Sequence, residues 1–264
     1  KGDIFARINP GSDAALALGM AHVIINESLY DEAFLIEQTD MPLLVREDNA
    51  QFLRSKDLED GAIEVKSGAF DEFYVIDQHG ELAKVPKTSL ALGELKPDMK
   101  ASRQAQLKNG ESVQVHTVFT LLQDKVSQYA PDKASAICGT PANQIIDLAR
   151  LMASAKSACM TTTSNIGKYY HGNLMERAQA LVFALCGQYG KKGSGFVAFP
   201  FLNLEGASNV VMSSMDPTGQ LRKQMAEGAK QLAAAGYTKE MIAYEMTRRR
   251  DESGTATQVH GSMF

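Results

Sequence analysis

The sequence predicts an α/β fold in which a β-rich segment interrupts strand–loop–helix units. Three observations support this prediction. Apolar residues recur at helical spacing in several segments, and short apolar runs precede two of the expected helices. Between them, residues 40–112 carry short runs separated by Pro, Gly, Asp and Lys. Strands that lead directly into helices are typical of α/β proteins with a parallel sheet.

The first strand–loop–helix unit lies at the N-terminus. Residues 4–8 should form a short strand that ends at residues 9–11. A helix should follow to about residue 26, with Ser12 as its N-cap and Asp13 in its first turn, where the helix dipole favours a negative charge. Because this helix is apolar on most of its faces, we expect it to be buried.

Residues 40–112 should form a β-rich insertion with long loops, preceded by a short helix over residues 30–37. Alternating and β-branched residues favour strands, and a polar turn should let two of them pair as a hairpin. The expected strands and turn are residues 62–66, 72–77, 78–81 (the turn) and 82–85.

After residue 112 the helical period returns. One expected helix carries Val115, Val118, Phe119, Leu122 and Val126 on one face. A short helix should then begin near residue 131 and end near Gly139, and Thr140 should cap the next helix, with Pro141 at its first position.

The second strand–loop–helix unit begins at residue 158. Residues 158–163 should form a strand, and a loop should extend to Gly172. The following helix should end at Gly187. Its expected inward stripe consists of Leu174, Ala178, Leu181 and Leu185.

We therefore expect a central α/β region over residues 1–206 and a helical extension over residues 207–264. The extension should contain helices at 220–235 and 239–250, of which Arg248–Arg250 forms a solvated end. Residues 251–264 should fray.

Composition excludes several classes of protein. The 27 Lys and Arg and 31 Asp and Glu of the 264 residues give a net charge of −4, which does not support nucleic-acid binding. No stretch approaches the ~20 apolar residues of a membrane span. Cys138, Cys159 and Cys186 are too scattered for a disulfide framework or a cysteine-held metal cluster, and we interpret them as small buried hydrophobic residues.

The first candidate site is the loop Gly11-Ser12-Asp13, since ligands of α/β proteins bind where strands lead into helices. Glycine lets the backbone approach a ligand closely. Ser12 and Asp13 could accept hydrogen bonds from a purine edge, and the helix N-terminus could favour an anion. The alternative is a plain turn with a cap and a dipole-favoured Asp.

The second candidate site is the loop of residues 164–172, which contains Ser164, Lys168 and His171. Lys168 could neutralise a phosphate or an anionic intermediate. His171 could carry a proton near neutral pH, or merely cap the following helix. An ordinary exposed polar loop remains the alternative. His22 should be a satisfied core residue, and His116 shows no neighbour of catalytic type in the sequence.

These loops carry a family resemblance. Residues 8–20, INPGSDAALALGM, resemble the segment of molybdopterin oxidoreductases of the dimethyl sulfoxide reductase family that typically reads PGTDAALALAM. The resemblance covers residues 3 to about 206 and continues through residues 26–34, 138–141 and 167–195. Residues 44–54 and 73–77 are similar to the branch that contains ethylbenzene dehydrogenase.

The resemblance implies bis-molybdopterin guanine dinucleotide (bis-MGD) with molybdenum or tungsten as the cofactor. Gly11, Ser12 and Asp13 match the loop that holds a guanosine end. Ser164 and Lys168 match positions that line the pterin side. Lys168 is the only catalytic residue that the resemblance implies, and His171 is a candidate for a residue that supports it from outside direct contact with the metal. No metal ligand is expected in this chain. Gln188 replaces a frequent Asn of the family, which leaves the role of that position open.

Catalytic subunits of the family are much longer, and they include an iron–sulfur segment, a metal ligand and a C-terminal domain that this chain lacks. We therefore expect a central fragment, inactive by itself, of a subunit that catalyses two-electron oxygen-atom transfer, hydroxylation or dehydrogenation. Its partners would be the rest of the subunit and an iron–sulfur electron-transfer subunit. The resemblance favours the periplasm, with the cytoplasm as the alternative.

Two other functions stay open. The chain could be a non-catalytic α/β binding or scaffold module derived from this family. It could also belong to a hydratase or transhydroxylase of the same cofactor family, whose net reaction is not redox.

Overall fold

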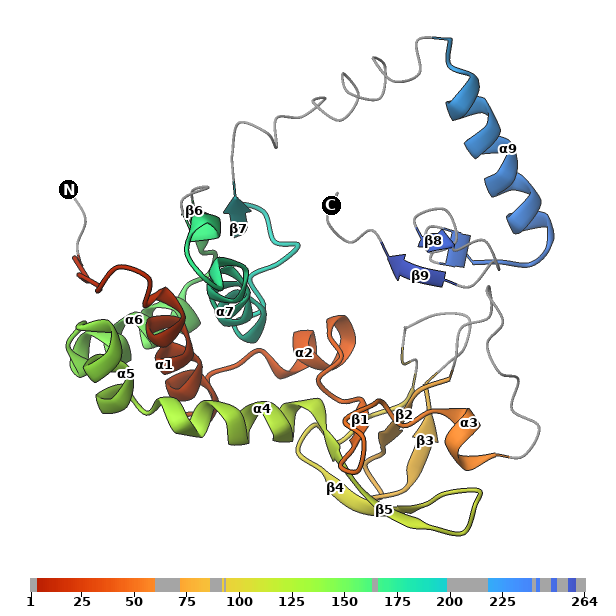
Figure 1. The fold of residues 1–264 in the computed structure, drawn as a ribbon, viewed down its shortest axis with the longest axis horizontal. Helices are drawn as coiled ribbons and strands as arrows, with labels where there is room; N and C mark the ends of the chain where they lie inside the picture. Colours follow the sequence, from red (N-terminus) through yellow and green to blue (C-terminus); the bar gives the residue numbers. More distant parts are fainter. Residues whose placement is uncertain are drawn as a thin grey trace. The chain divides into compact units, whose positions relative to one another are not determined.

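The computed structural model describes residues 4–59, 72–85, 92, 94–162, 166–198, 218–238, 241–242, 248–250 and 256–259. The chain forms two compact units, residues 1–42 with 117–204 and residues 43–116 with 205–264. The chain contains both helices and small β-sheets, so the fold is α/β, as predicted (Figure 1).

Helix α1, Asp13–Asn26, lies at the centre of the first unit. It packs against four further helices: α4 (Val118–Val126), α5 (Pro131–Cys138), α6 (Ala142–Ser154) and α7 (Gly172–Leu185). No residue from Asp13 to Ile25 is exposed, which confirms the buried helix. Gly19 lets α1 and α5 approach closely, because a Cβ at this position would lie 2.7 Å from the Ala134 Cβ.

The predicted strand–loop–helix unit at residue 158 is confirmed. Strand β6, Cys159–Thr162, pairs in parallel with β7, Gly195–Ala198, and the 3₁₀ turn η2, Ile166–Lys168, and α7 form the crossover between them. Such a helical crossover is what parallel pairing requires. Cys159 is exposed, so the prediction that all three cysteines are buried is wrong at this position.

The strand predicted at residues 4–8 is wrong. This segment is irregular, and Ile4 and Phe5 are 41% and 84% exposed. Its C-terminal end is held by hydrogen bonds to the end of α5, among them the one that the Asn9 N–H donates to the Cys138 carbonyl at 2.7 Å. β-branched composition favoured a strand, but a strand needs a neighbouring ladder, and the described residues supply none here.

Two predicted helix caps are also wrong in detail. Ser12 is the N-cap residue of α1, but its hydroxyl does not cap the helix. It donates instead to the carbonyl of Asn9, which precedes the helix, at 2.6 Å. The Thr140 hydroxyl donates to the Arg7 carbonyl at 2.9 Å, and Pro141 is the N-cap of α6. Each hydroxyl thus donates to a backbone carbonyl of the segment before α1 and does not accept from the first N–H groups of a helix.

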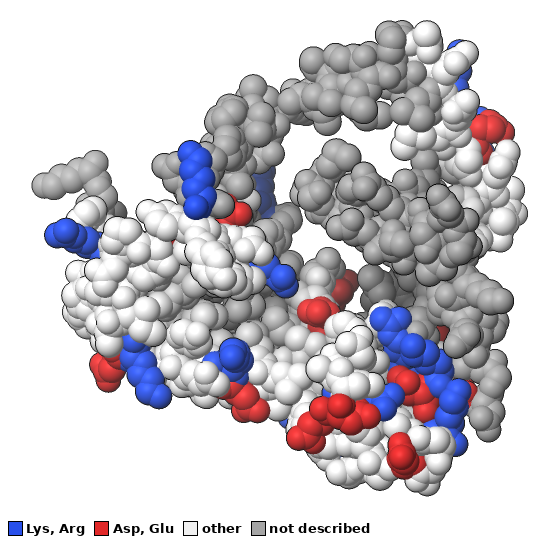
Figure 2. Space-filling view, in the orientation of Figure 1, with Lys and Arg blue, Asp and Glu red and all other residues white. Residues whose placement is uncertain are grey.

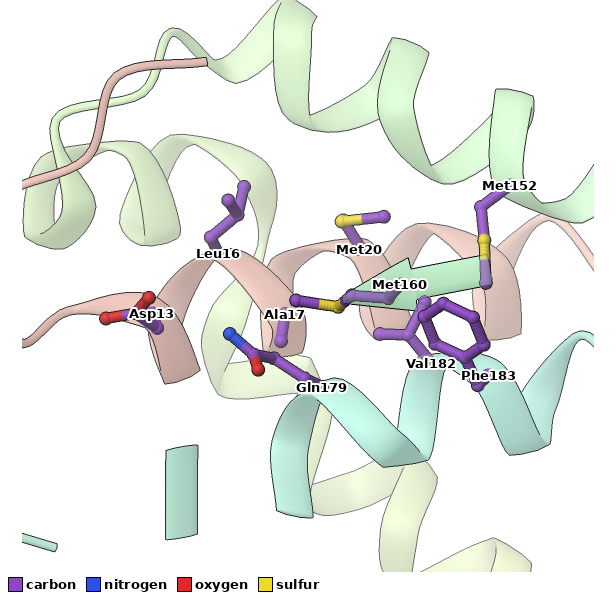
Figure 3. A pocket seen from close by; sticks show the side chains of 9 residues that line it. All are labelled: Asp13, Leu16, Ala17, Met20, Met152, Met160, Gln179, Val182 and Phe183. Atoms are coloured by element: carbon purple, nitrogen blue, oxygen red, sulfur yellow. The ribbon is translucent and has the colours of Figure 1, made fainter. Parts of the chain in front are cut away.

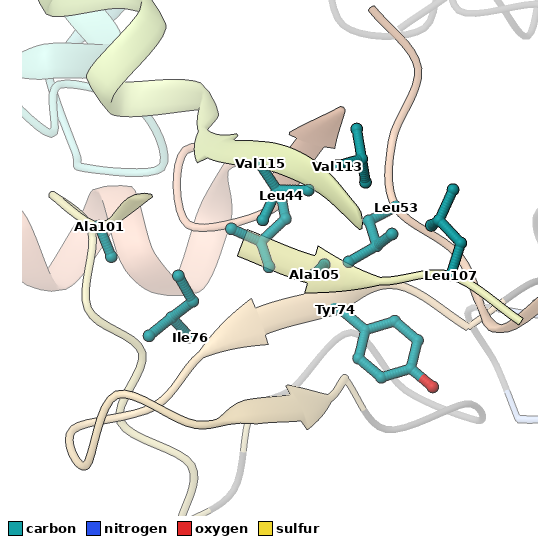
Figure 4. Close-up of a cluster of buried hydrophobic side chains, with 9 residues drawn as sticks. All are labelled: Leu44, Leu53, Tyr74, Ile76, Ala101, Ala105, Leu107, Val113 and Val115. Carbon is teal, nitrogen blue, oxygen red and sulfur yellow. The ribbon is translucent and has the colours of Figure 1, made fainter. Parts of the chain in front are cut away.

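The β-rich unit contains a three-stranded sheet and a hairpin. The sheet has the order β1-β5-β4, from β1 (Leu44–Arg46), β5 (Ser112–Thr117) and β4 (Ser102–Gln106). The hairpin pairs β2 (Tyr74–Ile76) with β3 (Leu82–Lys84) across the predicted turn, while the run at 62–66 lies outside the described residues. Short helices α2, Glu32–Gln38, and α3, Ser55–Leu58, flank β1 in sequence. Nine side chains from the unit form one buried cluster (Figure 4).

The helix predicted from residue 112 begins later. Ser112–Thr117 is strand β5, whose Val113, Val115 and Thr117 are buried in alternation. Helix α4 starts only at Val118, where the Thr117 hydroxyl accepts from the Thr120 N–H at 3.2 Å. Val115 fits both a period of 3.6 and a period of 2, and pairing with β4 decides for the strand.

In the C-terminal region, helix α9, Gln220–Ala234, is confirmed. The predicted helix end at Arg248–Arg250 and part of the predicted fraying are wrong, because β8, Arg248–Arg250, pairs antiparallel with β9, Ala256–Val259. None of the helices in the described ranges has the length and apolarity to cross a membrane.

Candidate functional site

The first candidate loop is anchored to the end of helix α5. The Asn9 side-chain amide donates to the Ile137 carbonyl at 3.1 Å, beside the backbone bond to Cys138. Gly11 follows with a φ of +80°, a backbone conformation that residues with a side chain rarely adopt. The sequence did not single out Asn9, yet its contacts set where the turn before Asp13 begins.

The second candidate loop is exposed and rich in aromatic rings. Lys168 is exposed at the end of η2, and Tyr169 and Tyr170 are 46% and 88% exposed. The His171 ring packs against the Tyr170 ring in a tilted arrangement, with centroids 4.0 Å apart and an angle of 54° between the ring planes. Ser164 lies outside the described residues.

His171 stands at the N-cap of α7, but its side chain makes no capping hydrogen bond. Its φ is +59°, which is uncommon for a residue other than glycine. Only its carbonyl contributes to the helix start, accepting from the Leu174 N–H at 2.9 Å. The prediction that the imidazole caps the helix is therefore wrong, and the ring is left on the surface of the loop.

The two candidate loops meet. A Cβ built on Gly11 would lie 3.4 Å from Cδ1 of Tyr169, so the ring that follows Lys168 lies beside Gly11, with room for no more than a methyl group between them. The helices that the two loops open, α1 and α7, also pack against each other. The structure thus brings Gly11, Ser12 and Asp13 beside the Lys168–His171 segment.

A pocket of about 110 Å³ lies beside these loops, between α1, α6, β6 and α7. Asp13 and Gln179 stand at one side of it, and methionine side chains line much of the rest (Figure 3). The lining residues are Asp13, Leu16, Ala17, Met20, Met152, Met160, Gln179, Val182 and Phe183.

Two buried polar atoms in this region have no hydrogen-bond partner among the described residues: Gln179 Oε1 and Thr162 Oγ1. Their residues are 9% and 4% exposed. A buried acceptor without a partner costs about 1–3 kcal/mol, and native proteins contain few. Thr162 is the last residue of β6, whereas Gln179 lies in the middle of α7 and lines the pocket.

Sequence reasoning missed Gln179, although a signal was present. The inward stripe of α7 consists of Met175, Ala178, Val182 and Leu185, and Gln179 lies on the same face. The predicted inward stripe is confirmed at Ala178 and Leu185 and is wrong at Leu174, which is 48% exposed. A polar residue on the apolar face of a helix is the pattern that would have identified it.

Gln188, whose role the sequence left open, holds the start of β6. Its Oε1 accepts from the Ala158 N–H at 3.0 Å, and its Nε2 donates to the Ala155 carbonyl at 2.9 Å. The side chain is almost completely buried. It therefore joins the segment before β6 to the segment after α7.

Two histidines outside the loops, His22 and His116, have structural partners. His22 Nδ1 lies 3.0 Å from the Val126 carbonyl, which confirms a satisfied core histidine. His116, contrary to prediction, has polar neighbours: Ser102 Oγ at 2.8 Å from Nδ1 and Glu47 Oε2 at 4.0 Å from Nε2. Burial raises the pKa of the Cys186 thiol to about 11. Within the described ranges, no group of three or more His, Cys, Asp or Glu could hold a metal ion.

Comparisons with known proteins place the chain among catalytic subunits. No family model matches it. It is 34% identical over 74% of its length to the perchlorate reductase alpha subunit of Dechloromonas aromatica, and 35% identical over 72% to the dimethylsulfide dehydrogenase alpha subunit of Rhodovulum sulfidophilum. The respiratory nitrate reductase alpha subunit of Haloferax mediterranei is 33% identical over 70%.

The chain spans only 23%, 20% and 20% of these three relatives. Acetylene hydratase from Pelobacter acetylenicus aligns structurally with 73% of this chain and 16% of that chain, at 20% identity and a TM-score of 0.40, which is too low to carry an argument. The sequence similarity to the three alpha subunits is sufficient by itself: the chain belongs to the dimethyl sulfoxide reductase family of molybdopterin oxidoreductases and corresponds to a fragment of their catalytic subunits.

Proposed function

We propose that this chain is a central part of the catalytic subunit of a molybdenum or tungsten oxidoreductase, and that its two adjoining loops bind bis-molybdopterin guanine dinucleotide. The observation that carries the proposal is the closeness of Tyr169 to Gly11, which brings the two loops together in the unit that also contains two buried polar atoms without partners. Family membership supports the pterin cofactor in general, and the loops supply the residues that would hold it.

In this proposal Gly11, Ser12 and Asp13 hold the guanosine end. Gly11 leaves the backbone open to close approach, and the start of α1 presents the positive end of a helix dipole to an anionic group. The Asp13 carboxylate can accept hydrogen bonds from a base. Ser164 and Lys168 line the pterin side, where the Lys168 ammonium offsets the negative charge of phosphate or of a dithiolene group.

The bound cofactor supplies two-electron oxygen-atom transfer or hydroxylation, while the protein binds, orients and adjusts the local charge. Lys168 is the proposed catalytic residue, because an exposed cation at the end of η2 can stabilise negative charge on a substrate oxygen. His171 can hold a proton next to it. The rest of the subunit and an iron–sulfur subunit would carry the electrons. The narrower similarity to the ethylbenzene dehydrogenase branch remains a prediction about substrate.

The test uses the complete native subunit. We expect stoichiometric molybdenum or tungsten by mass spectrometry and GMP after acid hydrolysis. Lys168→Ala should lower turnover about a hundredfold with unchanged metal content, whereas Lys192→Ala, at another exposed lysine, should not. A metal-free native subunit would contradict the proposal and favour a non-catalytic module, and wild-type turnover of Lys168→Ala would remove the catalytic role of that residue.

A further inference from the structure

A second cavity of the first unit lies between α2 and the end of α7. Its volume is about 740 Å³, which is in the range of sites that hold small molecules. It shares no lining residue with the pocket beside the two loops, and no residue of either candidate loop lines it. The cavity is therefore separate from the site proposed for the cofactor.

Two aromatic side chains line this cavity from different elements. Phe34 belongs to α2, and Tyr189 follows the end of α7. The Tyr189 ring packs against Phe183 with centroids 6.4 Å apart, and its hydroxyl donates to the Ala180 carbonyl at 3.3 Å. Because its hydroxyl hydrogen is already engaged, Tyr189 offers a ligand its ring rather than a donor.

The charge along the cavity wall is negative. Asp31 and Glu37 both line the cavity. Asp31 is already engaged, since Oδ1 accepts from the Phe34 N–H at 3.1 Å and Oδ2 lies 3.6 Å from Lys191 Nζ. Glu37 is exposed and has no ion pair or hydrogen bond with a described residue. One negative charge next to aromatic surface is thus left without a cation.

Small residues leave room for the body of a ligand. Ala33, Ala184 and Gly190 line the cavity, and a Cβ built on Gly190 would meet no atom within 4 Å. An anion would be repelled by the carboxylates, and a neutral apolar molecule would bring no partner for Glu37. A cation gains from both features, because aromatic rings attract cations and charge-assisted hydrogen bonds to carboxylates are strong.

We propose that this cavity binds a small organic cation, an amine or amidine with an apolar body. Its charged group pairs with Glu37, and its apolar body packs on Phe34 and Tyr189. The site goes beyond the proposed function, since it uses neither the cofactor nor the residues assigned to it.

The probe is benzamidinium, which joins a planar cation to an apolar ring, and benzyl alcohol is its neutral analogue. Binding to the complete native subunit is measured by isothermal titration calorimetry. Benzamidinium should bind about tenfold more tightly than benzyl alcohol, and Glu37→Gln should remove this preference. Glu32→Gln, at an exposed carboxylate of the same helix that does not line the cavity, should bind as wild type does.

A steric variant tests the location without changing a charge. Ala33→Leu places a larger side chain in the cavity and should weaken benzamidinium binding about tenfold. Ala136→Leu, the same change at an exposed position of α5, should leave it unchanged. Wild-type affinity in both Glu37→Gln and Ala33→Leu would refute the proposal, and so would the absence of benzamidinium binding to the wild-type subunit.

A cross-linking experiment separates a free cation from a lysine side chain of the surrounding polypeptide. A water-soluble carbodiimide joins a carboxylate to an amine that lies against it. The wild-type subunit should give no cross-link from Glu37 to a lysine by peptide mass spectrometry. Such a cross-link would show that the polypeptide itself supplies the cation, and would overturn the assignment of a small-molecule site.

Discussion

Among the described residues, buried side-chain oxygens without a hydrogen-bond partner occur in the helical unit and not in the β-rich unit, although other buried polar side chains of the helical unit, such as Gln188, have their partners. In the β-rich unit, Arg46 binds Asp48 at 2.6 Å and Asp57 at 2.9 Å, and the Tyr74 hydroxyl donates to Glu59. In the helical unit, Thr162 and Gln179 each leave a buried oxygen without a described partner. Satisfied polar groups indicate a finished scaffold, whereas unsatisfied ones indicate a surface that another molecule completes.

The two units also differ in one apolar region each. The cluster around Leu44, Leu53 and Val115 is closed, with each of these residues 0% exposed (Figure 4). In the helical unit, Met20, Met152 and Met160 surround an open pocket instead (Figure 3). Acidic and basic side chains lie next to each other over the β-rich region, as expected for paired charges (Figure 2).

The largest effect should come from breaking a satisfied pair in the β-rich unit. Asp57→Ala leaves the half-buried Arg46 with Asp48 alone and removes the acceptor of the Arg54 N–H. We expect the free energy of unfolding to fall by about 3 kcal/mol, measured by urea denaturation. Glu94→Ala, at an exposed carboxylate of the same unit, is the control. An equal loss in both variants would contradict the view of Asp57 as a structural partner.

A smaller loss of folding free energy should follow when the two hydrogen bonds of the Gln188 side chain are removed. Gln188→Ala leaves the Ala158 N–H and the Ala155 carbonyl without their partner, which should cost about 2 kcal/mol. Gln188→Glu keeps the acceptor for Ala158 and should lose less. If Gln188→Ala unfolds at the wild-type urea concentration, the clamp has no energetic role.

The third prediction compares two buried threonines, one whose hydroxyl has no described hydrogen-bond partner and one whose hydroxyl accepts a hydrogen bond. Thr162→Val removes an unsatisfied hydroxyl at nearly constant shape and should stabilise the cofactor-free chain by about 1 kcal/mol. Thr117→Val removes a hydroxyl that accepts from the Thr120 N–H and should destabilise it by a similar amount. Calorimetric unfolding of both variants provides the measurement. Effects of the same sign would break the comparison between satisfied and unsatisfied groups.

The smallest effect concerns pH. Backbone N–H groups of Glu81 and His79 donate to Asp77 Oδ1 in the hairpin turn and hold the pKa of that carboxyl below its ordinary value of 3.8. Because the folded-state pKa is lowered, the stabilisation is present above the ordinary pKa and is lost as the pH falls through the folded-state value. The melting temperature of Asp77→Asn should therefore decline less than that of wild type between about pH 5 and pH 2. Parallel declines would show that Asp77 is not linked to acid unfolding.

Much of the fold could be predicted because its determinants are local. The start of α1 was predicted from Ser12 and Asp13, α5 was predicted from Pro131 and Gly139, and the polar turn after Asp77 located the hairpin. Gly139 ends α5 with a φ of +78°, as expected for a helix followed by glycine. Family motifs likewise lie in short contiguous segments, so the sequence by itself sufficed to identify both candidate loops.

Only the tertiary structure determined the features that depend on residues distant from one another in the sequence. Pairing with β4 makes residues 112–117 a strand, and pairing with β9 makes Arg248–Arg250 a strand, although the local pattern favoured helix in both places. The contact of Gly11 with Tyr169 and the burial of Gln179 depend on how α1 packs on α7. A sequence pattern shows which face of a helix is apolar, but only packing determines which polar groups lose water without gaining a partner.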